Sequence, residues 1–118
     1  MKRVLLCFLL MAGAELALAE SLHRGLNGAW FDPANDGQGL LLEVTPELGL
    51  VSAYWFTFDP VTGQQLWLVA AAPFADDRAE FEWLEVSGGE FTGAALVERQ
   101  VRGTGVLETD GCGAVSYT

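Results

Sequence analysis

From Glu20 onward the sequence consists of short apolar runs separated by Gly, Pro, Asp and Asn, and no run has a helical period long enough to predict a helix. Runs of this length, with these turn residues between them, are typical of antiparallel strands. We expect eight strands, at 28–31, 38–45, 50–58, 66–74, 80–87, 91–98, 102–109 and 113–118. The predicted fold class is all-β, an antiparallel meander that forms an up-and-down barrel or a sandwich.

The predicted hairpin at 50–74 is apolar on both faces. A five-residue connection at 59–63 that pairs Phe58 with Gln64 would place Trp55 opposite Trp67 on one face. Its other face would then carry Tyr54, Phe56, Phe58, Leu66 and Leu68. Because a half-exposed antiparallel sheet has one polar face, we expect this hairpin to be central. Its second face would be covered by a facing sheet, a partner molecule or an apolar ligand.

Glycine-containing pairs mark several of the turns. Asp36-Gly37, Gly88-Gly89 and Asp110-Gly111 supply the positive φ that tight hairpin turns require. The alternation of polar and apolar residues is regular over 80–83 and breaks at Leu84-Glu85. This break predicts a β-bulge in that strand.

The N-terminus has the three parts of a secretory signal peptide. Lys2 and Arg3 precede an apolar run, and the small residues Ala17 and Ala19 precede Glu20. We therefore expect a signal peptide at 1–19 and a single β domain at 20–118. The mature protein would be periplasmic or extracellular, and it would have no membrane segment because the run is shorter than the roughly 20 residues of a membrane helix.

The charge balance excludes several classes of partner. The chain has 16 acidic and 6 basic residues, and its formal net charge is −10. Cleavage after residue 19 would leave no lysine and four scattered arginines. Nucleic acids and anionic membranes are poor partners for such a chain, because binding them requires clustered cations.

Few residues could support catalysis or bind a metal. His23 is the only histidine, and we expect it in a solvated tail, which argues against a Ser-His-Asp or Cys-His site. His23 and Cys112 alone cannot complete a zinc site. The loop 32–37 has three oxygen-bearing side chains, which turn formation explains without calcium. We therefore predict no catalytic residue, no metal site and no cofactor.

Aromatic residues are the remaining functional candidates. The chain has four tryptophans, whose flat faces suit sugars or apolar ligands, although a small β domain also needs them for its core. We expect a binding or association module for a small apolar or carbohydrate ligand, with Trp30, Trp55 and Trp67 as ligand-binding residues. One alternative is a glycan hydrolase that uses two carboxylates, and another is a structural fragment of a larger assembly. The hydrolase would draw on Glu43, Glu82 and Glu85.

Cys112 is the only cysteine outside the signal peptide. In an oxidising compartment an odd cysteine predicts an intermolecular disulfide or a free thiol, unless it is a small core residue. A homo-oligomer is therefore among the expected partners.

Three segments resemble a module that is common in uncharacterised secreted bacterial proteins. They are Gly28-Ala29-Trp30-Phe31-Asp32-Pro33, Asp36-Gly37-Gln38-Gly39-Leu40, and Tyr54-Trp55-Phe56-Thr57-Phe58-Asp59 followed by Leu66-Trp67-Leu68. The resemblance covers about residues 28–68, and 110–117 is similar to the late strand of the module. It implies export and an all-β fold but no activity. Members continue beyond that strand, which implies a sheet that is incomplete at its C-terminal end. A weaker similarity, in the Gly-x-Trp opening, is to avidin-like and lipocalin-like barrels.

Overall fold

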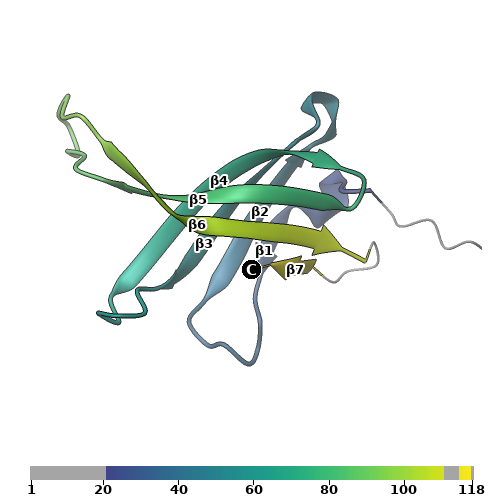
Figure 1. The fold of residues 1–118 in the computed structure, drawn as a ribbon, viewed down its shortest axis with the longest axis horizontal. Helices are drawn as coiled ribbons and strands as arrows, with labels where there is room; N and C mark the ends of the chain where they lie inside the picture. The colour runs from purple at the N-terminus through teal and green to yellow at the C-terminus, as the bar shows by residue number, and fades with distance from the viewer. Residues whose placement is uncertain (1–20, 111–114, 118) are drawn as a thin grey trace, which may run out of the picture.

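The computed structural model describes residues 21–110 and the backbone of 115–117, and the structural statements below concern these residues. Seven antiparallel strands form one sheet in chain order (Figure 1), which confirms the all-β meander. The strands are β1 (Gly28–Trp30), β2 (Gly39–Thr45), β3 (Leu50–Phe58), β4 (Gln65–Ala75), β5 (Arg78–Ser87), β6 (Glu98–Thr109) and β7 (Val115–Tyr117). Two short 3-10 helices accompany them, η1 (Arg24–Leu26) and η2 (Pro46–Leu48).

The number of strands and the closure of the sheet differ from the prediction. Residues 91–97 form no strand, and β6 begins at Glu98. Gly93 within this segment and Gly88-Gly89 just before it lower the strand propensity, and exposed side chains such as Phe91 and Leu96 have no facing surface on which to pack. A barrel or sandwich is not confirmed, because β1 and β7 are the two edges of an open sheet in the described chain.

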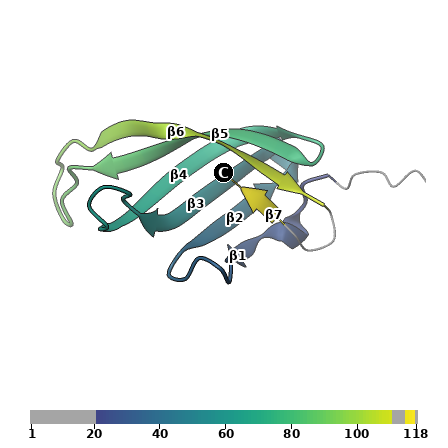
Figure 2. The same ribbon diagram turned by 60° about the horizontal axis from the view of Figure 1, so that its bottom comes forward.

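The sheet is twisted and curled, and its concave face holds the core (Figure 2). Three inward positions of β3 and β4 are occupied by small residues, Ala53, Ala70 and Ala72. β5 contributes two large inward side chains, Phe81 and Trp83, which are each 3% exposed. Small residues on one wall leave room for the large rings of the other, as close packing of a core requires.

The N-terminal segment is part of this core. Leu22 and Leu26 are buried, and the Leu22 N–H donates a hydrogen bond to the Asp76 carbonyl at 2.8 Å. His23 is half-buried, and its Nδ1 accepts a hydrogen bond from the Gly25 N–H at 3.1 Å. The prediction of a solvated tail at His23 is therefore wrong, because the two leucines on either side hold the segment against the sheet.

The register of the central hairpin also differs from the prediction. Phe58 pairs with Gln65 rather than Gln64, so Trp55 lies opposite Leu68. The physical reason is that Asp59 takes part in the ladder: its N–H donates to the Gln64 carbonyl at 2.8 Å. This shift by one residue moves the side chain of Trp67 to the other face of the sheet.

A register shift occurs at Leu84, where the sequence predicted a bulge, but the extra residue is on the partner strand. Trp83 pairs with Gly103 and Leu84 with Val101, so Arg102 is the extra residue on β6. Pairing between β5 and β4 ends at Leu84. Beyond it, β5 and β6 continue as a two-stranded ribbon that projects from the sheet (Figure 1).

A candidate binding groove on the convex face

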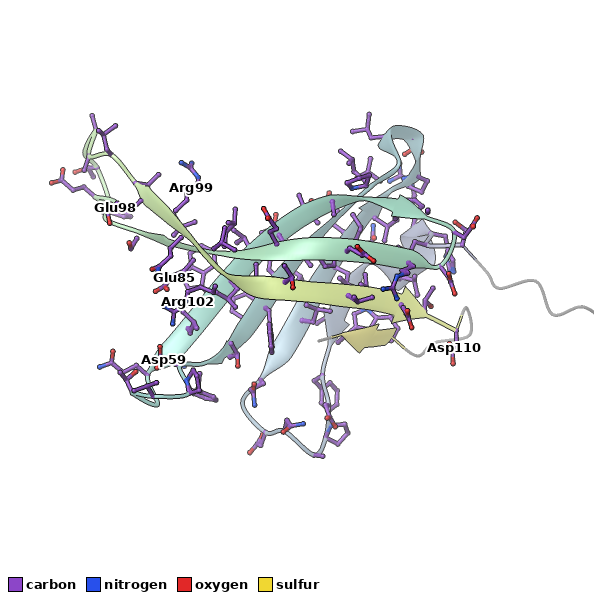
Figure 3. All side chains as sticks on the ribbon, viewed as in Figure 1. Asp59, Glu85, Glu98, Arg99, Arg102 and Asp110 are labelled. Atoms are coloured by element: carbon purple, nitrogen blue, oxygen red, sulfur yellow. The ribbon has the colours of Figure 1, made fainter. Side chains whose placement is uncertain are left out.

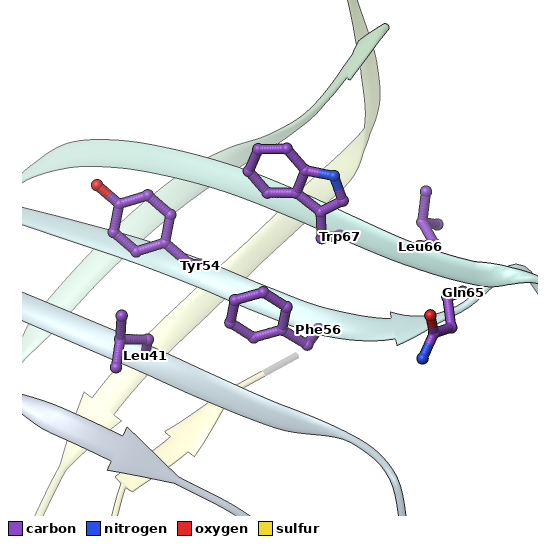
Figure 4. A pocket seen from close by; sticks show the side chains of 6 residues that line it. All are labelled: Leu41, Tyr54, Phe56, Gln65, Leu66 and Trp67. Carbon is purple, nitrogen blue, oxygen red and sulfur yellow. The ribbon is translucent and has the colours of Figure 1, made fainter. Parts of the chain in front are cut away.

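An open groove lies on the convex face of the central strands. Leu41 of β2 pairs with Tyr54 of β3, and Phe56 of β3 pairs with Trp67 of β4. These four side chains lie together on one face (Figure 4). The groove has a volume of about 470 Å³, and we call it the aromatic groove. It is lined by Leu41, Tyr54, Phe56, Gln65, Leu66 and Trp67.

The large side chains of the groove are unusually exposed. Trp67 is 53% exposed, Phe56 49% and Leu41 41%. Strand alternation causes this, because their neighbours Leu68 and Leu40 take the inward positions and are buried. A contiguous apolar surface of this kind on a chain with strong net charge is typical of an interaction site.

Apolar residues continue across the sheet beside the groove. The register places Leu41, Tyr54, Val69, Leu84 and Val101 in one row over β2 to β6. Val101, at the far end of this row, is 53% exposed. The apolar convex surface therefore extends from β2 to the base of the projecting ribbon.

The groove has groups that can stack on a ligand and hydrogen-bond to it. None of its six lining residues is an Asp, Glu, His, Lys or Arg. Its polar side-chain groups are the Tyr54 hydroxyl, the Gln65 amide and the Trp67 indole N–H. Aromatic faces with a few polar groups at their edges suit both apolar ligands and sugars.

Of the three tryptophans predicted to bind a ligand, the structure places only Trp67 in the groove. The indole N–H of Trp30 donates to the Leu26 carbonyl at 2.8 Å, and its ring packs against the core. Trp55 faces inward, with its ring centroid 5.5 Å from that of Trp83. Sequence reasoning assigned Tyr54 and Phe56 to the face opposite Trp67, because the assumed register was one residue out.

The three carboxylates considered for a hydrolase do not meet. Glu43 is exposed on β2, whereas Glu85 lies 3.4 Å from Arg102 in an ion pair. Glu82 shares a polar groove between β5 and β6 with Glu80. Residues two apart on a strand are separated by about 7 Å, but both carboxylates are exposed and Glu80 pairs with Arg78. A glycosidase acid must be shielded from water to stay protonated, so the hydrolase alternative has weaker support.

The acidic loop before β2 uses its oxygens in turns. Asp32 accepts hydrogen bonds from the Ala34 N–H at 2.9 Å and the Asn35 amide at 2.6 Å. The hydrogen bond from the Ala34 N–H contributes most to holding the pKa of Asp32 below its usual value, and the hydrogen bond from Asn35 contributes next. Within the part of the chain that the structure describes, no three His, Cys, Asp or Glu residues are grouped so as to hold a metal ion. Cys112 lies outside the described residues.

The described residues include no helix that is long and apolar enough to span a membrane. Comparison with family models, with curated proteins and with solved structures gave no match to the chain.

Proposed function

We propose that this protein is a secreted or periplasmic binding module, which takes an uncharged apolar or carbohydrate group in the aromatic groove. The observation that carries the proposal is the cluster of half-exposed Phe56 and Trp67 rings, paired across two strands in an uncharged groove. Covering these rings would remove apolar surface from water, at roughly 25 cal/mol per Å². We favour a binding module over an enzyme because none of the residues that line the groove is an Asp, Glu, His, Lys or Arg.

The test is a titration with an uncharged apolar probe, N-phenyl-1-naphthylamine, whose fluorescence rises in apolar surroundings. We expect W67A to weaken binding of the probe about tenfold, because a lost aromatic stacking surface is worth on the order of 1.4 kcal/mol. The matched control is F31A, since Phe31 is 73% exposed and lies outside the groove. Equal binding by the native protein and both variants would contradict the proposal.

The same titration with a soluble β-linked oligosaccharide, cellohexaose, separates the two ligand classes. Quenching of the Trp67 fluorescence by the oligosaccharide, lost in W67A, would identify a carbohydrate ligand. A response to the apolar probe alone would identify an apolar one.

A further inference from the structure

The ribbon that projects from the sheet ends in an uncharged apolar loop. Residues 91–97 contain no Asp, Glu, Lys or Arg, in a chain where 19% of residues are charged. Phe91 is fully exposed and Leu96 is 90% exposed. We call residues 86–99, the ribbon and its loop, the apolar arm. Large apolar side chains at the end of a projecting element indicate a contact with another molecule.

Ion pairs fix the base of the arm. Arg102, the extra residue of the bulge, donates to Asp59 at 3.0 Å and lies 3.4 Å from Glu85 (Figure 3). These ion pairs join the base of the arm to the turn between β3 and β4. A Cβ added at Gly88 would lie 3.3 Å from the Leu96 carbonyl oxygen, and one added at Gly89 would lie 3.5 Å from the Val97 side chain, so the two sides of the arm pack on each other.

The arm and the aromatic groove match in chemistry. The arm loop at 91–97 and the lining of the groove contain no charged side chain, although the whole chain carries a net charge of −10. The charged residues of the arm, Glu90, Glu98 and Arg99, flank this loop. Two copies of an acidic chain repel each other, so a contact between them must avoid placing carboxylates together. Residues 91–97 and the six residues that line the groove meet this condition, because none of them is charged.

We propose that the aromatic groove is occupied by the apolar arm of a second copy of this chain, with Phe91 and Leu96 as the inserted side chains. This inference rests on the proposed function, because it names the partner of the same groove. Reciprocal exchange, with each arm in the other groove, covers both surfaces and closes the assembly as a dimer. Added salt then strengthens association, because it screens the repulsion between the two acidic chains.

The test is sedimentation equilibrium of the mature chain under reducing conditions, which prevent a disulfide at Cys112. We expect a concentration-dependent dimer, whose dissociation constant rises at least tenfold in F91S/L96S and in W67S. The matched control is V61S: Val61 is 91% exposed in another turn, and its change leaves the dimer intact. Because Phe91 and Leu96 are exposed, the double variant is expected to fold normally, and near-ultraviolet circular dichroism checks this.

Mixing the two variants makes the test specific. F91S/L96S retains an intact groove and W67S retains an intact arm, so their mixture should form a heterodimer that neither variant forms alone. A protein that is monomeric at millimolar concentration, or a dimer unchanged in both variants, would overturn the inference. If the monomer still binds the apolar probe through Trp67, the proposed function stands although the dimer does not. If W67A binds the apolar probe as tightly as the native protein does, the proposed function itself is contradicted.

Discussion

At the scale of single residues, the four tryptophans have different roles that follow from which face of the sheet they occupy. Trp83 is 3% exposed and contacts both Trp55 and Phe81, with centroid separations of 5.5 and 5.3 Å. Trp67 has the opposite orientation and is half exposed. Tryptophan content alone could not distinguish a core role from a binding role, because the distinction depends on strand register.

The first prediction compares these two tryptophans. W83A should lower the free energy of unfolding by about 3–5 kcal/mol, because the cavity left behind lies at the centre of the aromatic core. W67A should lower it by at most about 1 kcal/mol, because little of its contact is with the core. Urea denaturation followed by far-ultraviolet circular dichroism measures both values. Similar losses for the two variants would contradict the assignment of faces.

A second prediction concerns Asp59. Its Oδ1 accepts hydrogen bonds from the N–H groups of Thr62 and Val61, each at 2.8 Å, and these bonds hold the pKa of Asp59 below its usual value. A lowered folded-state pKa means that the stabilisation is present above the unfolded pKa, near 3.9, and is lost as pH falls through the folded pKa. At pH 7, D59A should melt at a lower temperature than D59N, which keeps an acceptor for the turn.

The Asp59 carboxylate also contacts Arg102, so the effect of its negative charge on stability must be measured apart from its role as a hydrogen-bond acceptor in the turn. The difference in melting temperature between the native protein and D59N should narrow as the pH falls below about 4. Scanning calorimetry between pH 3 and 7 measures this. A difference that stays constant over that interval would show that the charge of Asp59 contributes nothing.

At the scale of elements, strand positions were more predictable than strand pairing. Alternating apolar residues and glycine-containing turns located seven of the strands, and β3 was predicted with the bounds that it has. The pairing of β3 with β4 depended on whether Asp59 belonged to the turn or to the ladder, which its hydrogen bonds decide and the sequence pattern does not. The place of Asp59 therefore decides whether Trp67 lies opposite Trp55 or opposite Phe56, and with it which side chains line the groove.

The prediction at this scale compares two glycines. Gly63 closes the β3–β4 turn with φ of 69°, whereas Gly103 of β6 has no positive φ, and a Cβ there would have nothing within 4 Å. G63A should cost about 1–2 kcal/mol through backbone strain. G103A should be neutral or stabilising by up to about 1 kcal/mol, because it restricts only the unfolded chain. Urea midpoints measure both, and equal effects would contradict the strained turn.

At the scale of the whole molecule, one curled sheet must cover its own core. The strands supply most of the core, but the segment before β1 adds Leu22 and Leu26 to it. Sequence patterning treated this segment as a tail because it has no strand period, although its two leucines are spaced like one turn of a helix. The convex face has no such cover among the described residues, and this contrast leaves the aromatic groove open while the concave face is buried.

The last prediction tests whether the N-terminal segment completes the core. In a chain that begins at Glu20, L22A should lower the free energy of unfolding by about 2–5 kcal/mol, because Leu22 is 2% exposed and leaves a cavity. The matched control is L48A, since Leu48 is 69% exposed and its truncation should change stability by less than about 0.5 kcal/mol. Urea denaturation measures both changes. If L22A unfolds at the same urea concentration as the native chain, the sheet covers its core without help, and the hydrogen bond from Leu22 to Asp76 contributes only to the position of the chain end.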